Sequence, residues 1–370
     1  MPPLLDFQYA AYVPATLTEV TVTGGTSLAY NAFRNCPYLE NIILPDTLTS
    51  LNYYVFLNCK NLTKIDIPDS VTNLGYSAFS GCESLMRIDI PSGVTKIAYS
   101  TFNGCSKLTE IVIPSGVTSV GSYAFEDCTA LTEITIPAGV TEIGGNAFSG
   151  CSSLTEITIP SGIRVLEQNL FSGCTALRRV DLPAGLYSIG SSAFSGCESL
   201  TEITLPSGLT SIGQQAFSGC ESLTEIEIPA GVTRIEDDTF RECAALTEIT
   251  LPSGLTSIGY NAFSGCTSLT EIEIPDGVTE IVGCAFEDCT ALTEITLPSG
   301  LTSIGERAFY GCRLTAVWYG GDEAAWADVS VDSSNNGVLT GKVYFYSPDP
   351  PAAEGNYWHY ADDGVTPVAW

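Results

Sequence analysis

Thirteen of the fourteen cysteines recur at a single spacing, and thiols can form disulfides, bind metals or act as nucleophiles. They lie 23 residues apart and are Cys36, Cys59, Cys82, Cys105, Cys128, Cys151, Cys174, Cys197, Cys220, Cys243, Cys266, Cys289 and Cys312. A cysteine that recurs once per structural unit occupies one environment many times, and pairing neighbouring units would leave one thiol over. No CxxC spacing typical of metal sites occurs. We therefore predict a column of buried free thiols that pack as small apolar side chains.

Other residues that could carry chemistry are few. Cys284 stands outside the series, at a position filled in other units by polar residues such as Ser77, Asn146 and Arg307, so we expect an exposed thiol without a partner. The single histidine, His359, lies in an aromatic tail, and we interpret it as a packed or surface residue because no second histidine is present to build a catalytic triad. We predict no catalytic residues, no metal and no cofactor. The alternative, an enzyme, would need a site in the C-terminal segment.

The most regular charged feature is a glutamate placed just before the first branched apolar residue of a predicted strand. It occurs at Glu19 and, as the candidate binding residues, at Glu110, Glu133, Glu156, Glu202, Glu225, Glu248, Glu271 and Glu294, with Glu227 and Glu273 two residues further on. Parallel strands lie about 4.8 Å apart, so these side chains form a column of carboxylates on the solvent face. We predict a binding surface for a basic protein or for cations. The alternative is that repeat duplication copied one glutamate, which then serves solubility.

Three units interrupt this column with a basic residue, and each carries an aspartate two residues later on the same face. The pairs are Lys64 with Asp66, Arg87 with Asp89, and Arg179 with Asp181. We interpret them as local charge compensation. An all-oxygen ladder could also bind Ca²⁺ weakly, but the Asp-x-Asp-x-Asp-Gly loop of dedicated calcium sites does not occur.

The elements that position these side chains follow from one repeating unit, illustrated by residues 200–220. Ile203 and Leu205 alternate with polar residues, which predicts a short strand with one buried face. Pro206 has no N–H and ends the strand. A second extended segment follows, and then Ala216 to Cys220, for which we expect a single helical turn. A phenylalanine precedes each of the thirteen cysteines by three residues. A 23-residue period predicts a solenoid in which stacked turns bury one continuous core.

This unit resembles the BspA-like (Treponema pallidum-type) leucine-rich repeat. The resemblance is carried by Leu-x-x-Ile-x-Ile-Pro at 131–137, Val-x-x-Ile-Gly at 140–144 and Ala-Phe-x-x-Cys at 147–151. It implies a right-handed leucine-rich-repeat solenoid of the α/β repeat class. It also implies a bacterial or protist surface protein used in adhesion, including contacts with host matrix proteins. The expected location is extracellular or at the cell surface, although this chain begins without a recognisable leader.

Both ends depart from the repeat, which predicts three parts: an N-terminal edge segment at 1–16, a solenoid of about thirteen turns at 17–317, and an aromatic cap at 318–370. All four tryptophans lie in the cap. Residues 322–328 predict a short helix, 342–346 a strand, and 356–370 a final hairpin. This cap resembles the C-terminal segments of Firmicutes members of the same family.

Charge and hydropathy limit the partners. The chain has 14 basic and 42 acidic residues and a net charge of −28, which argues against nucleic acid and against an anionic membrane surface. No apolar run approaches the roughly 18 residues of a membrane span. We therefore predict a non-catalytic binding or adhesion module that recognises a protein or glycan through its acidic strand face. The alternative is a passive spacer or stalk in a larger surface protein.

Overall fold

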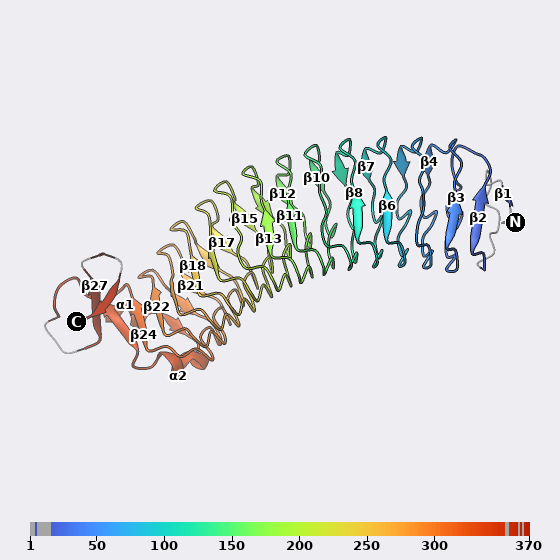
Figure 1. Cartoon of the computed structure of the whole chain (residues 1–370). Helices are drawn as coiled ribbons and strands as arrows, with labels where there is room; N and C mark the ends of the chain where they lie inside the picture. The colour runs from blue at the N-terminus through green and yellow to red at the C-terminus, as the bar shows by residue number, and fades with distance from the viewer. Residues whose placement is uncertain (1–3, 6–15, 352–354, 362, 365) are drawn as a thin grey trace. The chain divides into compact units, whose positions relative to one another are not determined.

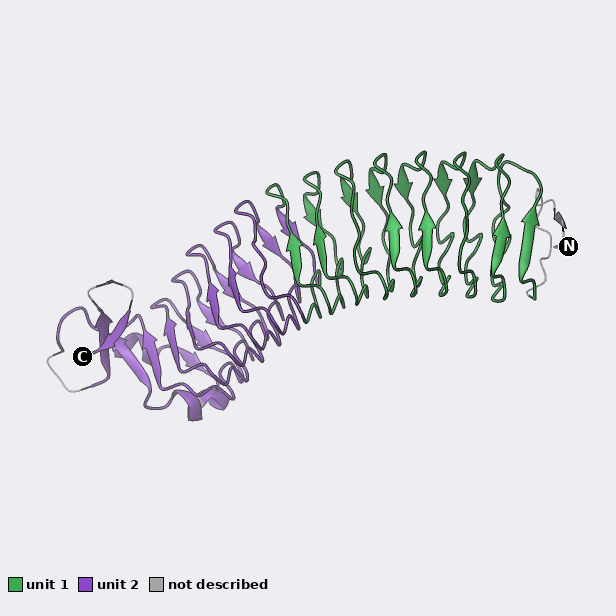
Figure 2. Ribbon diagram, in the orientation of Figure 1, with its two compact units in different colours: residues 1–186, 192–198 green, residues 187–191, 199–370 purple. Residues whose placement is uncertain are grey.

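The computed structural model describes residues 4–5, 16–351, 355–361, 363–364 and 366–370. Most of the predicted N-terminal edge segment therefore lies outside the described residues, apart from strand β1 (Leu4–Leu5), which pairs in parallel with β2 (Glu19–Val22). The chain divides into two compact units, shown in Figure 2. Unit 1 contains residues 1–186 and 192–198, and unit 2 contains residues 187–191 and 199–370.

Unit 1 is a solenoid whose 23-residue coils build two parallel strand ladders, with no strand assigned to the first ladder at 64–66 and 133–135 (Figure 1). After β2, its first ladder contains β3 (Asn41–Ile43), β6 (Arg87–Asp89), β8 (Glu110–Val112), β11 (Glu156–Thr158) and β13 (Arg179–Asp181). Its second ladder contains β4 (Ser50–Leu51), β5 (Asn73–Leu74), β7 (Lys96–Ile97), β9 (Ser119–Val120), β10 (Glu142–Ile143) and β12 (Val165–Leu166).

Unit 2 repeats the same plan. Its first ladder contains β16 (Glu225–Glu227), β18 (Glu248–Thr250), β20 (Glu271–Glu273), β22 (Glu294–Leu297) and β24 (Ala316–Tyr319). Its second ladder contains β14 (Ser188–Ile189), β15 (Ser211–Ile212), β17 (Arg234–Ile235), β19 (Ser257–Ile258), β21 (Glu280–Ile281), β23 (Ser303–Ile304) and β25 (Ser330–Val331). At 202–204 no strand is assigned, but Ile203 and Leu205 are buried as predicted.

The core of each unit is built from columns of identical side chains. The repeat phenylalanines are buried and stack in parallel, with ring centroids 5.2 to 5.7 Å apart and planes within 17° of each other. Burying one such side chain contributes about 1.5–3 kcal/mol. Aromatic pairs add about 0.5–1.5 kcal/mol beyond the buried area.

The periodic cysteines form a second column beside the phenylalanines, as predicted. All are free thiols and buried, except Cys312, which is half-buried. Eleven of these thiols donate a hydrogen bond to the backbone carbonyl of the phenylalanine 26 residues earlier. Cys82, for example, donates to Phe56 at 3.2 Å. Burial raises the pKa of the Cys82, Cys128 and Cys151 thiols, and that of Cys105 to about 12. A neutral, hydrogen-bonded thiol is a small hydrophobe with one useful donor.

The segment expected to be a helical turn is not helical. Residues 214–219 form consecutive turns, and Gln215 and Gly219 have positive φ angles of 58° and 71°. Alternate N–H groups donate to the next coil rather than along the chain: from Gln215 to Asp237, Phe217 to Thr239 and Gly219 to Arg241, at 3.0, 2.9 and 2.7 Å. A helix would need those N–H groups for its own carbonyls, so the prediction of a helical turn was wrong.

The C-terminal segment of unit 2 continues both ladders and then closes them. The expected helix is α1 (Glu323–Ala327), capped by the Asp322 side chain, which accepts from the Ala325 N–H at 2.8 Å. The 3₁₀ helix η1 (Ser333–Asn335) and helix α2 (Asn336–Leu339) follow. The expected strand is β26 (Val343–Tyr346), which pairs in parallel with β24. The expected hairpin is formed by β27 (Tyr357–Tyr360) and β28 (Pro367–Ala369), which pair antiparallel.

Asn335 replaces the missing next coil at this end. Its side chain is buried, accepts from the Phe309 N–H at 3.0 Å and donates to the Gly305 carbonyl at 2.8 Å. In the coils before it, the equivalent phenylalanine N–H donates to a backbone carbonyl of the following coil, as Phe286 does to Ala308 at 2.8 Å. One amide side chain therefore ends a backbone ladder that has no further coil to donate to.

The phenylalanine column gives the first stability prediction. Phe217→Ala should lower the free energy of unfolding by about 3–5 kcal/mol, because the cavity lies in a stack that only neighbouring coils can relax. Urea denaturation measures this loss. Tyr187→Ala, which removes an exposed aromatic ring, is the control and should change stability by less than about 0.5 kcal/mol. A small effect at Phe217 would contradict a tightly packed column.

The side chain of Asn335 gives a second stability prediction. Asn335→Ala leaves the Phe309 N–H and the Gly305 carbonyl without their side-chain partner, and should cost about 2–4 kcal/mol. Tryptophan fluorescence reports the transition, because all four tryptophans lie in this segment. The control is Asn356→Ala, whose bonds to Gly341 and Val343 are long, at 3.5 and 3.3 Å. Equal effects of the two substitutions would show that Asn335 does not end the ladder.

Candidate functional site

The predicted acidic column lies on the outer face of the first strand ladder. In β16 the buried Ile226 separates Glu225 and Glu227, which are both exposed. The strands pair in register, so Glu225 stands opposite Glu248, and Glu271 opposite Glu294. Like charges placed opposite each other destabilise a sheet, and exposure to water reduces that cost.

Four of the predicted glutamates are brought together in one groove of unit 2. Glu202, Glu225, Glu227 and Glu248 line a volume of about 680 Å³ that runs across three coils. Its other polar lining residues include Thr204, Ser207 and Thr250, and its apolar part includes Pro229 and Ala230. No lysine or arginine is among the residues that line it. The groove can therefore accept positive charge along its length.

The remaining candidates lie outside this groove. Glu271, Glu273 and Glu294 occupy the same columns on later coils of unit 2, and Glu294 is half-buried because the indole N–H of Trp318 donates to its carboxylate at 3.0 Å. Glu110, Glu133 and Glu156 are exposed in unit 1. An arginine nitrogen of Arg87 lies 4.0 Å from Glu110, so that carboxylate is partly compensated.

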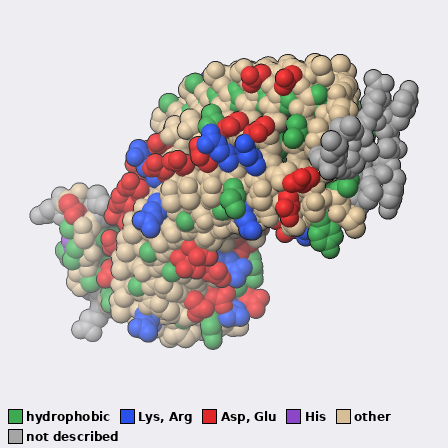
Figure 3. All heavy atoms as spheres, turned by 45° about the vertical axis from the view of Figure 1, so that its right-hand side comes forward, with side chains coloured by type: hydrophobic (Ala, Val, Ile, Leu, Met, Phe, Trp, Pro, Cys, Tyr) green, Lys and Arg blue, Asp and Glu red, His purple; other side chains and the backbone are tan. Residues whose placement is uncertain are grey.

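The basic interruptions of the column pair with aspartate, as expected. Lys64 lies 3.0 Å from Asp66, Arg87 lies 3.2 Å from Asp89, and Arg179 lies 2.9 Å from Asp181. All three pairs belong to unit 1. Unit 1 has 17 acidic and 9 basic residues, a net charge of −8, whereas unit 2 has 25 and 5, a net charge of −20. On the face drawn in Figure 3, acidic side chains gather in several patches.

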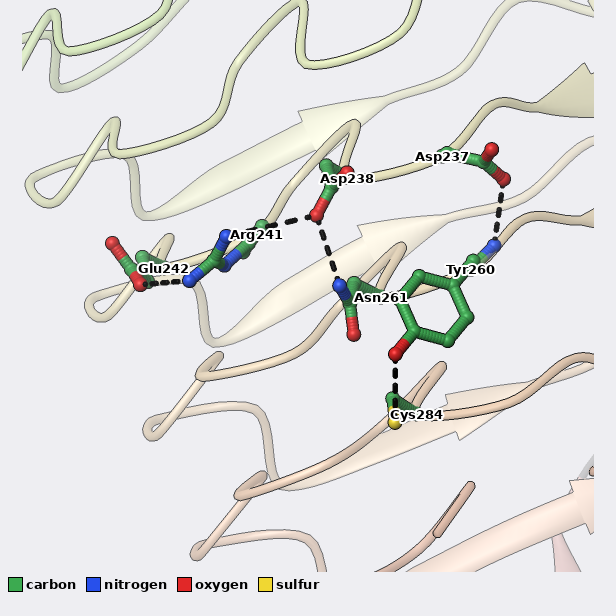
Figure 4. Close-up of polar contacts among 7 residues, drawn as sticks. All are labelled: Asp237, Asp238, Arg241, Glu242, Tyr260, Asn261 and Cys284. Carbon is green, nitrogen blue, oxygen red and sulfur yellow. Dashed lines mark hydrogen bonds and ion pairs between the residues drawn. The ribbon is translucent and has the colours of Figure 1, made fainter. Parts of the chain in front are cut away.

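Cys284 is not the exposed thiol that its position suggested. Its side chain is only 7% exposed, and its Sγ lies 3.6 Å from the phenol oxygen of Tyr260, one coil earlier (Figure 4). Burial raises the pKa of the thiol, while the Tyr260 hydroxyl lowers it. The prediction failed because it compared positions within the repeat, whereas the burial depends on a tyrosine in the neighbouring coil.

The surroundings of Tyr260 are a surface hydrogen-bond network rather than a reactive centre. Asp237 accepts from the Tyr260 N–H at 2.8 Å, Asp238 accepts from the Asn261 amide at 3.1 Å, and Arg241 pairs with Glu242 at 3.0 Å (Figure 4). His359 is packed in the cap, with its ring centroid 3.9 Å from that of Trp370. Over the described residues, no group of three His, Cys, Asp or Glu side chains is placed to hold a metal.

Stacked 23-residue coils, two parallel ladders and a phenylalanine core define a leucine-rich-repeat protein. The chain belongs to the family described as the BspA type leucine-rich repeat region, whose six-copy model matches residues 26–155, 97–224 and 210–322. The predicted resemblance is thereby confirmed. The family and the structures similar to this chain are described as leucine-rich repeat proteins.

Two solved structures, from Bacteroides ovatus and Eubacterium ventriosum, support the same fold. A leucine-rich repeat protein from Bacteroides ovatus is 28% identical, with a TM-score of 0.58, over 88% of this chain and 92% of its own. One from Eubacterium ventriosum is 22% identical, with a TM-score of 0.55, over 84% and 88%. The leucine-rich repeat protein of Treponema pallidum is 29% identical, with a TM-score of 0.39, over 50% and 78%. The comparison with curated proteins gave no match. Within the described part of the chain, no helix has the length and apolarity to cross a membrane.

Thiol accessibility tests the cysteine assignments. In the folded protein the thirteen buried thiols, Cys284 included, should react slowly with a small disulfide reagent, and the half-buried Cys312 should react first. Denaturation should release all fourteen for reaction. Mass spectrometry after partial labelling identifies the order. Early labelling of Cys284 would contradict its burial under Tyr260, and Tyr260→Ala should accelerate labelling at that position alone.

Proposed function

We propose that this protein is a non-catalytic recognition module that binds a basic macromolecule along the acidic strand face of unit 2. The observation that carries the proposal is the groove lined by Glu202, Glu225, Glu227 and Glu248 without a basic residue. In unit 1 the basic residues of the column neutralise aspartates, whereas in unit 2 the groove carboxylates have no such neighbours on the strand face. Uncompensated charge of one sign attracts a partner of the other sign.

Electrostatics also defines how such a partner would bind. A column of exposed carboxylates accelerates encounter with a basic surface and fixes its register along the coils, and both effects weaken as salt is added. The lysine and arginine side chains of a partner could each reach a different coil, so affinity would accumulate over the length of the groove. A protein segment rich in lysine and arginine fits this description better than a small cation.

The biological setting is part of the same proposal. Membership in the BspA type family suggests a protein-interaction module of the bacterial surface, and we propose an extracellular or cell-surface location with a role in adhesion. A protein ligand, such as a host matrix protein, would meet the acidic face there.

A passive spacer is the competing function, and two residues favour binding over it. Ile43 and Val112 lie on the strand face of unit 1 and are 64% and 60% exposed. A spacer needs only solubility on this face, and large exposed apolar side chains oppose solubility. Ile43 also lines a small hollow of about 170 Å³ with Asp46, Asp66 and Pro68. These departures from the repeat are more typical of a contact surface.

Two charge-neutralised variants with equal net charge test the proposal. The groove variant carries Glu→Gln at 202, 225, 227 and 248, and the control variant carries Glu→Gln at the exposed positions 198, 221, 280 and 306. Both lose four negative charges. With a lysine-rich peptide as the probe, the groove variant should bind about tenfold more weakly than the control and lose most of the salt dependence of the association rate.

Stability must be measured on the same samples. The groove variant should melt at or slightly above the temperature of the parent protein, because the substitutions remove repulsion between exposed carboxylates. If the groove variant and the control variant bind the peptide equally, net charge alone governs binding and the groove is not a recognition site.

A further inference from the structure

A second surface of unit 1 differs in chemistry from the acidic strand face. It is made of five segments, 26–31, 49–54, 72–77, 95–100 and 118–123, and we call it the tyrosine flank. Each segment except the first contains or adjoins a strand of the second ladder, β4, β5, β7 and β9 in turn, and each contributes one tyrosine to a column. These residues are Tyr30, Tyr53, Tyr76, Tyr99 and Tyr123.

The five rings form a continuous ladder, and four of them are exposed. Successive centroids are 5.3, 4.6, 6.5 and 5.3 Å apart. Tyr30, Tyr53, Tyr76 and Tyr99 are 57%, 38%, 48% and 50% exposed, and Tyr123 is half-buried. Scattered exposed aromatic residues are common on protein surfaces, but a contiguous run of this length marks an interaction site.

The ring orientations divide the ladder into a stacked pair and two turned rings. Tyr53 and Tyr76 lie face to face, with planes within 8°. Tyr30 and Tyr99, on either side of the pair, are turned by 64° and 73° from their neighbours in it. The stacked pair shields one face of each of its rings, whereas the turned rings, which are the two most exposed, can offer a face to a ligand.

The tyrosine flank is almost free of charge in a strongly acidic protein. The five segments contain no aspartate or glutamate, and their one charged residue is Lys96. The same ladder position in unit 2 carries Asp237 and Glu306. A surface whose one charged residue is a lysine, on a chain of net charge −28, offers no carboxylate to the basic partner proposed for the strand face, and it fits a partner that is itself uncharged.

The polar groups of the flank are mainly hydroxyls and amides. Thr49, Thr72 and Thr118 each donate to the carbonyl of the threonine in the preceding coil, at 3.0, 3.5 and 3.3 Å, which leaves their hydroxyl oxygens able to accept. The phenol groups of the ladder make no hydrogen bond within the described residues, so each can both donate and accept. A proline-rich peptide offers chiefly carbonyl acceptors, whereas a sugar offers hydroxyls that do both.

We propose that the tyrosine flank is a binding surface for an uncharged, extended glycan chain. Sugar rings present C–H groups that pack on the electron-rich faces of aromatic rings, here those of Tyr30 and Tyr99. Their hydroxyls would exchange hydrogen bonds with the phenols and threonines. The coils repeat at the spacing of parallel strands, about 4.8 Å, and an extended β-linked glycan advances by a similar length per sugar. Successive sugars can therefore advance in step with the coils, with C–H packing at Tyr30 and Tyr99 and hydrogen bonds to the coils between them.

Affinity electrophoresis tests this proposal. Native gels would contain neutral soluble polysaccharides, namely hydroxyethylcellulose, mixed-linkage β-glucan, xylan or glucomannan, and the parent protein should be retarded by at least one. The ladder variant carries Tyr→Ala at 30, 53, 76 and 99. It should bind that polysaccharide at least about tenfold more weakly. The control variant carries Tyr→Ala at 38, 187 and 310, which are exposed positions outside the ladder, and should be retarded like the parent.

Two further measurements make the outcome decisive. Retardation should persist between about 50 and about 500 mM salt, because the flank is uncharged, and the ladder variant should keep its melting temperature, because the rings are exposed. Absence of retardation on all four polysaccharides, or equal retardation of ladder and control variants, would overturn the proposal. So would ladder-dependent binding of a poly-L-proline peptide with no polysaccharide bound. The acidic-face test with the lysine-rich peptide is independent of every one of these results.

Discussion

A coil of this protein can bury its phenylalanine only if the next coil places the same ring directly above it. The 23-residue register does this, and it imposes one rule on every position: a side chain stacks on its own counterpart. The phenylalanine rings stack at 5.2 to 5.7 Å, and threonine hydroxyls donate to threonine carbonyls of the preceding coil. Thiols donate to phenylalanine carbonyls. Because a single coil cannot offset its ordering entropy, this stacking holds the rest of the structure together.

The same rule acts on surfaces, where its consequences differ with the residue type. A repeated glutamate becomes a line of repulsive carboxylates, which is tolerated because the side chains stand in water. A repeated tyrosine becomes a ladder of rings that support one another. The two units therefore acquire distinct surfaces from one plan, with an acidic groove in unit 2 and an uncharged aromatic flank in unit 1. Small changes at one position of the repeat are enough to produce that difference.

Much of the architecture could be predicted from the sequence because the phenylalanine and cysteine of the core recur in all thirteen repeats. The phenylalanine and cysteine columns, the alternation around Ile203, and the helix, strand and hairpin of the C-terminal segment were all predicted. The helical turn was not predicted correctly, because the sequence does not reveal that alternate N–H groups at 215–219 bond to the next coil. Cys284 was mistaken for an exposed residue because the residue that covers it, Tyr260, belongs to another coil.

Of the candidate glutamates, the sequence could align Glu202, Glu225 and Glu248, but only the structure showed that they share a groove. The tyrosine ladder was not predicted because its residues recur in only some coils and do not belong to the constant positions of the repeat.

The local nature of the hydrogen bonding has a consequence for how such a chain can change in length. Each coil bonds to the coil before it and the coil after it, and Asn335 satisfies the last ladder with a side chain rather than with a particular partner coil. Insertion or loss of one whole 23-residue segment within a unit would therefore leave every remaining contact type intact. Coils of other lengths occur at the two ends of the solenoid, where Glu19 pairs with Asn41 and Ser303 with Ser330. Genetic slippage between near-identical repeats is accordingly harmless to folding when it acts in whole units. It lengthens or shortens the acidic groove and the tyrosine flank, so the reach of each surface can evolve separately from the stability of the fold.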